Sequence, residues 1–242
     1  MLTCCVHSSL LTFTRLATDT HAHQVAINGR RVLVGWIGGW TGASQSLARD
    51  LSLSSTYELL QAFVPELERL RVPGSLTTTD FIGTDETAKV GIPHAGGSMQ
   101  LEVVATFEWT GATPPTKPFG VSFLNGTRTI MIDCVPGKHG GDPQAPNGCM
   151  VRGDGNFPNI FGGNSGSGPL MPLGQKSARV HTIVDHTIFE TIVNNRTAMV
   201  AYSPMTKDPP GTAVQLVGVP AGVTGTISSW NLKAANNAGP QP

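Results

Sequence analysis

The sequence predicts an all-β protein built around an antiparallel β-sandwich with a jelly-roll-like arrangement. Short apolar runs recur along the 242 residues and are separated by turns, and the chain contains 29 glycines and 18 prolines. Helical periodicity is scarce. Many short strands with little helix are typical of a sandwich, and the chain length suits one β-rich domain or two small ones.

The first predicted elements are two strands over residues 31–37 and 46–53. A glycine-containing turn around Trp40 separates them. Two strand-like runs joined by such a turn indicate a hairpin.

Residues 57–71 carry leucines and other apolar residues at helical spacing, but Pro65 lies inside this stretch. Proline interrupts a helix interior and is well accepted at a helix start. We therefore expect only one or two helical turns, from Pro65 to Arg71. This stretch is interpreted as a connector between two structural units.

Residues 99–109 show the clearest alternation in the chain. Alternation of this kind predicts a strand with one buried and one wet face. The predicted buried face consists of Leu101, Val103, Ala105, Phe107 and Trp109.

Further strands are predicted in the second half of the chain. They cover residues 119–124, 128–133, 180–193 (as a pair), 198–202, 213–219 and 224–232. Asn125-Gly126 indicates a tight hairpin between the first two. The region 137–172, rich in glycine, proline and asparagine, is interpreted as a long loop, either active or inserted.

Composition excludes several function classes. Sixteen basic and sixteen acidic residues give a formal net charge of zero, so the chain lacks the basic field that gathers phosphates, and no nucleic-acid partner is expected. The apolar runs are too short for a transmembrane helix, so no membrane partner is expected. Residues 1–16 lack a basic segment, so we expect no signal peptide there.

No residue is assigned a catalytic role from its pattern, and no metal or cofactor is expected. The turn Gly163-Asn164-Ser165-Gly166 resembles a protease nucleophile turn only imperfectly and is interpreted as a loop. His21 and His23 are interpreted as a surface pair. His181 and His186 lie in an apolar region and are expected to be partly buried and hydrogen-bonded.

Four residues are candidates for covalent modification. Cys134 and Cys149 flank a loop that a disulfide could close, although four cysteines do not decide the redox compartment. Asn125 and Asn195 each begin an Asn-x-Thr pattern that fits N-glycosylation and that also arises by chance.

Asp185 and Glu190 lie among isoleucine, valine and phenylalanine residues. A carboxylate in such surroundings must be paired, protonated or turned outward. For Asp185, a turn made with Thr187 is favoured over catalysis.

At this point the sequence resembles glycoside hydrolase family 32, the invertase and β-fructofuranosidase family. The segment 184–197 is similar to a strand pair of its C-terminal sandwich, with Asp185, Thr187, Glu190 and Arg196 at motif positions. Thr187 stands where the family has serine.

The first part of the chain carries the same resemblance. Residues 29–37, with Trp36, and residues 45–49, with Gln45 and Arg49, are similar to strands of the last propeller blade. Residues 64–71 resemble the linker and residues 225–233 the closing strand. The resemblance spans about residues 28–233 in the family's order.

The resemblance implies a division of the chain. Residues 28–56 would be a hairpin left over from a five-bladed propeller, 57–75 the linker and 76–235 the sandwich. Residues 1–27 would be a poorly defined segment and 236–242 a tail.

The resemblance also implies a function and its limits. The family hydrolyses sucrose or fructans, but its nucleophile motif Asn-Asp-Pro-Asn, its Arg-Asp-Pro and its Glu-Cys are absent from this sequence. We expect no activity of the chain alone, and a propeller-bearing polypeptide or a homodimer as partner. The alternative is a non-catalytic carbohydrate-binding or protein-interaction sandwich. The family's enzymes are secreted or vacuolar.

Overall fold

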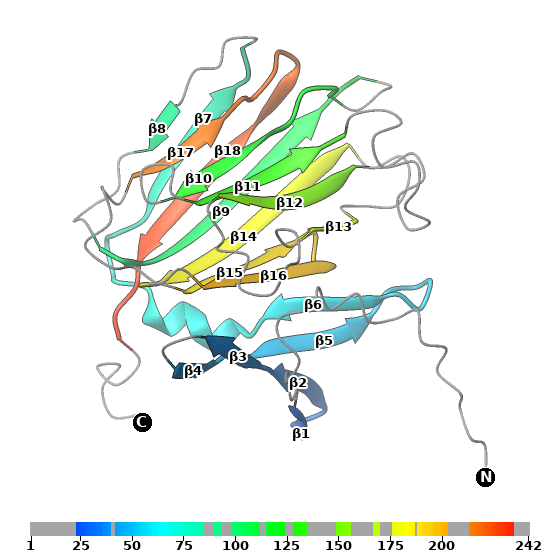
Figure 1. Cartoon of the computed structure of the whole chain (residues 1–242), viewed down its shortest axis with the longest axis vertical. Helices are drawn as coiled ribbons and strands as arrows, with labels where there is room; N and C mark the ends of the chain where they lie inside the picture. Colours follow the sequence, from blue (N-terminus) through cyan, green and yellow to red (C-terminus); the bar gives the residue numbers. More distant parts are fainter. Residues whose placement is uncertain are drawn as a thin grey trace.

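The computed structural model describes residues 23–39, 42–84, 90–92, 98–111, 115–123, 128–134, 149–155, 167–169, 176–186, 188–202 and 213–234. Within these ranges the chain forms antiparallel strands and a single short 3-10 helix (Figure 1). The predicted all-β antiparallel sandwich is confirmed. No helix in these ranges is long and apolar enough to cross a membrane.

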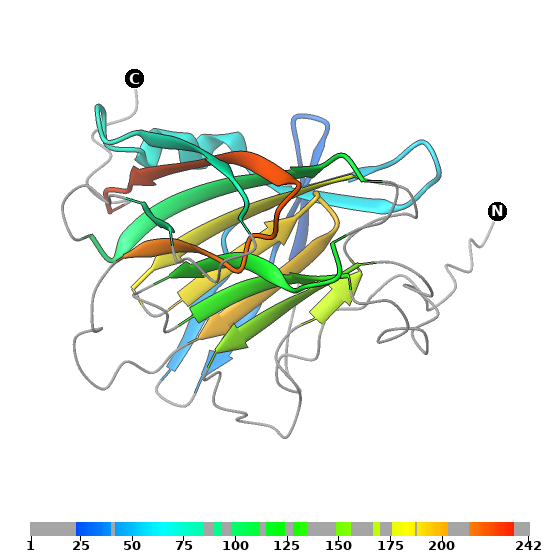
Figure 2. The same ribbon diagram turned by 90° about the horizontal axis from the view of Figure 1, so that it is seen from above.

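Two six-stranded sheets form the sandwich (Figure 2). We call the first the docking sheet, and its strands in spatial order are β16 (Thr197–Tyr202), β15 (Ile188–Val193), β14 (Ser177–Asp185), β9 (Gln100–Trp109), β18 (Val223–Asn231) and β7 (Thr77–Ile82). We call the second the outer sheet, and its order is β13 (Ser167–Pro169), β12 (Met150–Gly155), β11 (Arg128–Asp133), β10 (Phe119–Phe123), β17 (Val214–Val217) and β8 (Val90–Ile92).

The core lies between these two sheets. The predicted buried face of β9 is confirmed, because Leu101, Val103, Ala105, Phe107 and Trp109 are all buried there. Phe107 meets Phe119 of β10 in an edge contact, with ring centroids 5.3 Å apart. Buried apolar residues of both sheets belong to one continuous cluster.

A third, four-stranded sheet precedes the sandwich, and we call it the N-terminal sheet. Its strands lie in chain order: β1 (His23–Ile27), β2 (Arg30–Val34), β5 (Arg49–Leu53) and β6 (Leu59–Phe63). Asn28 and Gly29, both with positive φ, make the two-residue turn from β1 to β2. Four antiparallel strands are the content of one propeller blade.

The predicted hairpin is present as β2 paired with β5, but neither strand has a free edge. β1 covers β2 and β6 covers β5, which the sequence did not predict. Between them the chain makes a small extra hairpin, β3 (Trp36–Gly39) with β4 (Gly42–Gln45). Both strands of the predicted hairpin are therefore paired on both sides within this chain.

The connector is a short helix, as predicted. η1 (Pro65–Leu70) begins at the proline and ends before Arg71. Residues 59–63, however, form strand β6 instead of the start of a helical pattern, because they pair along β5. The boundaries of the domains stay predictions.

The interpretation of residues 137–172 as one long loop is wrong in part. β12 and β13 lie inside that region and extend the outer sheet. Their glycines disfavour strand structure locally, but the ladder with β11 provides the pairing, from Arg128 opposite Gly155 to Asp133 opposite Met150. The glycine-rich turn at Ser165 lies outside the described residues.

Candidate functional site

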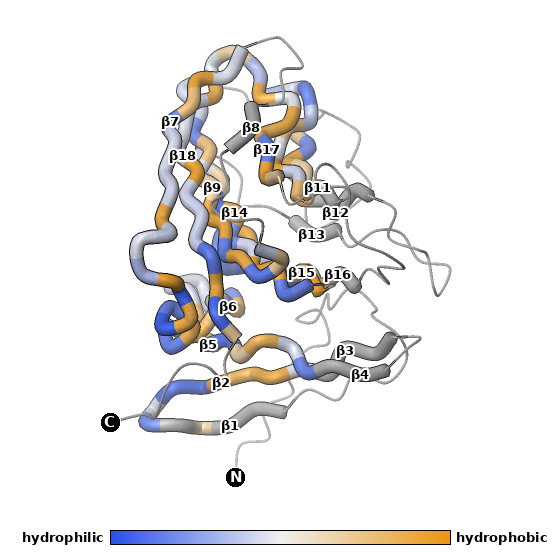
Figure 3. Tube along the Cα trace, turned by 90° about the vertical axis from the view of Figure 1, so that its left-hand side faces the viewer, coloured by the Kyte–Doolittle hydropathy of each residue, from blue (hydrophilic) through white to orange (hydrophobic). Residues whose placement is uncertain are grey.

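The N-terminal sheet lies beneath the sandwich, next to β15 (Figures 1 and 3). It and the helix η1 cover side chains on the face of the docking sheet that points away from the core. We call this surface the docking face and define it by Glu102, His181, Ile183, Glu190, Ile192 and Trp230. All six project from β9, β14, β15 and β18.

The register of the sheet places the two acids of the docking face in one row. Glu102 on β9 and Glu190 on β15 both pair with Ile183 of β14, from opposite sides. Strands lie about 4.8 Å apart, so the two acids sit on either side of a single apolar residue.

Glu190 binds β5 and the segment just before it through both carboxylate oxygens. Its Oε2 accepts a hydrogen bond from Nη2 of Arg49 at 2.8 Å, and its Oε1 accepts one from the backbone N–H of Leu47 at 2.6 Å. The side chains of Arg49 and Glu190 are only 5% and 2% exposed. The carboxylate is therefore paired, which is one of the three states expected from its apolar surroundings.

Burial raises the pKa of the Glu190 carboxyl, because the loss of water outweighs the attraction of Arg49 and the Leu47 N–H. Nε of Arg49 is buried and has no hydrogen-bond partner. Taking the two charges out of water therefore costs free energy, and removing only one partner would be strongly destabilising. A buried ion pair of this kind fixes the relative position of the two segments that it joins.

Glu102 binds the connector at the other end of the row. Its Oε2 accepts from Nε of Arg71 at 2.7 Å, and its Oε1 accepts from Nη2 of Arg71 at 2.8 Å. His181 lies 2.7 Å from the same Oε1 through its Nε2. The guanidinium of Arg71 also lies over the ring of Trp230, 4.2 Å from its centroid.

These contacts determine how Glu102 titrates. Burial of the Glu102 carboxyl works to raise its pKa, but the hydrogen bonds from Arg71 and His181 outweigh burial and lower the pKa to about 2. Glu102 therefore stays ionised at every ordinary pH.

An apolar contact fills the space between the two acids. Phe63, the last residue of β6, packs with Ile183 and Ile192. The Phe63 ring also meets the His181 ring edge-on, with centroids 4.9 Å apart. Partly buried residues that surround this cluster are Leu47, Leu67, Ala198 and Leu232.

The rim of the interface is polar. The backbone N–H of Gln61 donates to the carbonyl oxygen of Asn195 at 2.6 Å, and its side-chain amide donates to the carbonyl oxygen of Arg196 at 2.8 Å. The Arg196 guanidinium forms an ion pair with Glu58. β6 is thereby connected to the turn between β15 and β16.

Three of the seven motif residues that the sequence singled out meet at this interface, namely Arg49, Glu190 and Arg196. Trp36 and Gln45 pair with each other in the small hairpin, where Gln45 is exposed. Thr187 lies outside the described residues, as does Asn125.

Asp185 is the last residue of β14 and lies outside the docking face as defined above. Its exposed side chain accepts a hydrogen bond from Gln100 at 2.9 Å and pairs with His186 at 2.8 Å. His186 is exposed as well, so the expectation that it is partly buried is wrong, because it occupies the turn after β14. That expectation is confirmed for His181.

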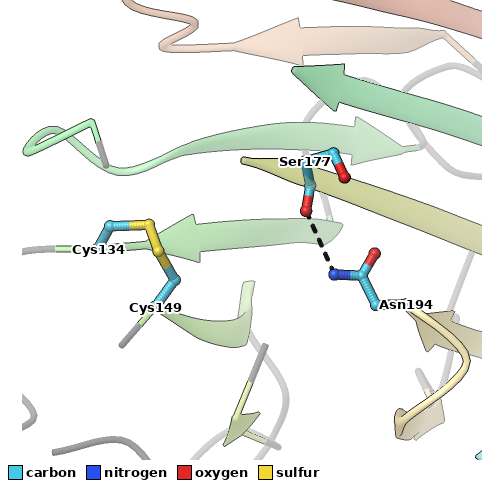
Figure 4. Close-up of a disulfide and its surroundings, with 4 residues drawn as sticks. All are labelled: Cys134, Cys149, Ser177 and Asn194. Atoms are coloured by element: carbon cyan, nitrogen blue, oxygen red, sulfur yellow. Dashed lines mark hydrogen bonds between the residues drawn. A yellow bond between two sulfur atoms is a disulfide. The ribbon is translucent and has the colours of Figure 1, made fainter. Parts of the chain in front are cut away.

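A disulfide joins Cys134, after β11, to Cys149, before β12 (Figure 4). In the same view the side-chain amide of Asn194 donates to the carbonyl oxygen of Ser177. The next residue, Asn195, is exposed in the turn between β15 and β16. Its glycosylation stays a prediction.

The docking face has no free acid for chemistry. A general acid must reach its substrate within hydrogen-bonding distance, whereas every oxygen of Glu102 and Glu190 is already bound by a residue of this chain. The described ranges also hold no group of three or more His, Cys, Asp or Glu residues that could hold a metal ion. The arrangement holds two parts of one chain together.

Sequence reasoning missed Glu102, Arg71 and Phe63 as members of this interface. Alternation along β9 assigned Glu102 to a wet face, which fits Glu108 but not Glu102. The sequence signal for this contact was the pair of arginines at the end of η1. An arginine there can reach a carboxylate on a neighbouring strand.

No protein-family model matches the chain, and no curated protein matches its sequence.

Solved structures do match the fold. The fructan 1-exohydrolase IIa of Cichorium intybus aligns over 89% of this chain with a TM-score of 0.66 and 15% identity. A fructofuranosidase variant of Schwanniomyces occidentalis, complexed with fructosylnystose, aligns over 89% with a TM-score of 0.59 and 17% identity. The sucrose-6-phosphate hydrolase of Lactobacillus gasseri aligns over 88% with a TM-score of 0.58 and 14% identity.

The chain spans less than half of each of these structures, namely 48%, 47% and 41%. The predicted resemblance to fructosidases and invertases is thus confirmed for the fold, and it covers both the N-terminal sheet and the sandwich. At 14–17% identity, this similarity in fold does not assign a function to any residue of the chain.

Proposed function

We propose that the chain is the non-catalytic part of an invertase-like glycosidase of family 32: one blade of its propeller, the linker and the C-terminal sandwich. The enzyme it belongs to would hydrolyse glycosyl bonds in sucrose or fructans. Within it, the sandwich supports the blade and performs no chemistry of its own.

The observation that carries this proposal is the buried Arg49–Glu190 pair. The pair joins residues 45–49 to residues 184–197, and each of these segments resembles the family on its own. The contact crosses the boundary between the blade and the sandwich. The fold shared with fructan and sucrose hydrolases over 88–89% of the chain supports the same assignment.

The proposal includes a lack of catalytic residues. The family's three acid motifs are absent from the sequence, and one blade cannot enclose the central pocket of a propeller. The two buried acids of the docking face are occupied by Arg49, Arg71, His181 and the backbone N–H of Leu47. A propeller-bearing polypeptide would have to supply the reacting groups.

The test is an assay of the purified chain with sucrose and with inulin, using a fructan exohydrolase as the positive control. We expect no release of fructose or glucose by the chain alone. Turnover by the chain that disappears in Asp185→Asn, at an exposed acid outside the buried pair, would overturn the proposal, since it would place a working acid in this chain.

A further inference from the structure

The turn between β5 and β6 presents an aromatic side chain to solvent in an unusual backbone conformation. Tyr57 has φ of 62° and is 81% exposed. Bulky residues rarely adopt positive φ, and such outliers concentrate at binding sites. The turn lies at the end of the N-terminal sheet (Figures 1 and 2).

Hydrogen bonds fix the backbone of this turn. Ser54 and Glu58 close the hairpin through the Ser54 N–H and the Glu58 carbonyl at 2.9 Å, and the Tyr57 N–H donates to the Ser54 carbonyl at 3.0 Å. A β-turn followed by one left-handed residue is a common three-residue hairpin loop, in which glycine usually takes the left-handed place. Here tyrosine takes it.

The polar side chains of the turn form hydrogen bonds within the turn itself. The Ser54 hydroxyl accepts from the N–H groups of Thr56 and Glu58 at 3.2 and 3.0 Å. Thr56 donates from its hydroxyl to Glu58 at 3.2 Å, and Glu58 is paired with Arg196. The ring of Tyr57 is therefore displayed on a rigid base with no unpaired charge beside it.

We propose that Tyr57 is a stacking platform for a carbohydrate, with one sugar ring lying on its face. The C–H bonds on one face of a sugar ring suit the negative face of an aromatic ring. The exposed residues Ser55 and Thr56 lie next to Tyr57 in the chain and add hydroxyl groups of the kind that fix the orientation of a sugar.

The size and charge of the surface favour a sugar over a protein. Leu53 is the other exposed large apolar residue at this end of the hairpin, whereas Leu76 and Ile82 belong to the sandwich part of the chain. The area that two side chains expose is similar to that of one or two sugar rings, whereas a stable protein interface buries about 800 Å² on each partner. The net charge of zero gives no reason to expect a charged ligand.

Two tryptophans of the sandwich are not available to stack on a sugar. Trp109 is buried in the core, and the face of Trp230 is covered by Arg71. Tyr57 lies on the N-terminal sheet, apart from both. The choice of a fructan as the sugar rests on the proposed function, whereas the stacking site itself does not.

The test uses NMR of protein carrying ring-labelled tyrosine. The chain has only two tyrosines, so Tyr57→Phe identifies the Tyr57 signal. Inulin-type and cellulose-type oligosaccharides are titrated separately. We expect the Tyr57 signal to shift with a Kd on the order of 1 mM for the inulin type.

Two variants separate binding from folding, with calorimetric titration as the readout. Tyr57→Asn keeps a residue that accepts positive φ, so the turn should fold while affinity falls by at least about tenfold. Ile82→Asn removes an exposed apolar residue elsewhere and should leave affinity unchanged.

Each result has a definite meaning. Binding of cellulose-type sugars alone would support the platform and contradict the fructan assignment. Equal affinity in Tyr57→Asn, or no shift with any sugar, would overturn the platform. A change in self-association of Tyr57→Asn without sugar binding would overturn it too and identify a protein contact.

Discussion

Arg49 and Glu190 lie 141 residues apart in the sequence and form a buried ion pair at 2.8 Å. The pair connects the N-terminal sheet to the sandwich, and Arg71 with Glu102 makes a second connection through the linker. With Phe63 between them, these contacts make one packed interface out of three segments.

Removal of one partner of the first pair should be strongly destabilising. We expect Arg49→Met to lower the free energy of unfolding by about 3–5 kcal/mol, because it leaves Glu190 buried without its counter-charge. Chemical denaturation followed by tryptophan fluorescence measures the loss.

The double variant Arg49→Met with Glu190→Leu is the matched control. It should recover most of the stability, because two apolar side chains can replace a buried ion pair at little cost. Additive losses in the double variant would show that the two residues do not interact.

Glu102 gives the protein a specific response to acid. Its folded pKa of about 2 lies below the ordinary value of 4.5, so it contributes stability above about pH 4.5 that is lost as pH falls toward 2. The stability gap between the parent chain and Glu102→Gln should therefore be full above about pH 5 and shrink as pH falls toward 2. Denaturation curves at a series of pH values test this, and a constant gap would contradict the assignment.

Tyr57 stores strain in the hairpin turn. Tyr57→Gly should raise the free energy of unfolding by about 1 kcal/mol, because glycine adopts positive φ freely. Thermal unfolding measures the gain. An unchanged or lower melting temperature would show that the tyrosine ring stabilises the turn in a way that offsets its backbone.

The sequence predicted the sandwich strands best where alternation was strict. β9 is the example, since all five of its predicted core residues are buried. It predicted β12 and β13 worst, because glycines and prolines there disfavour a strand and only the ladder with β11 stabilises one.

The Arg49–Glu190 contact was not predictable from the local sequence. Nothing local to Arg49 or Glu190 indicates that they touch, because side-chain pairing across 141 residues depends on the whole topology. Glu102 was assigned to solvent, since alternation distinguishes the two faces of a strand but not what covers the second face.

The central claim is that the N-terminal sheet and the sandwich form one cooperative unit held by the docking face. Native-state hydrogen exchange tests it most directly. The account predicts that backbone amides of β5 and β14 exchange with the same free energy of opening, equal to global unfolding, and that Arg49→Met makes β5 exchange first. Independent exchange of β5 at much lower free energy in the parent chain would contradict the claim.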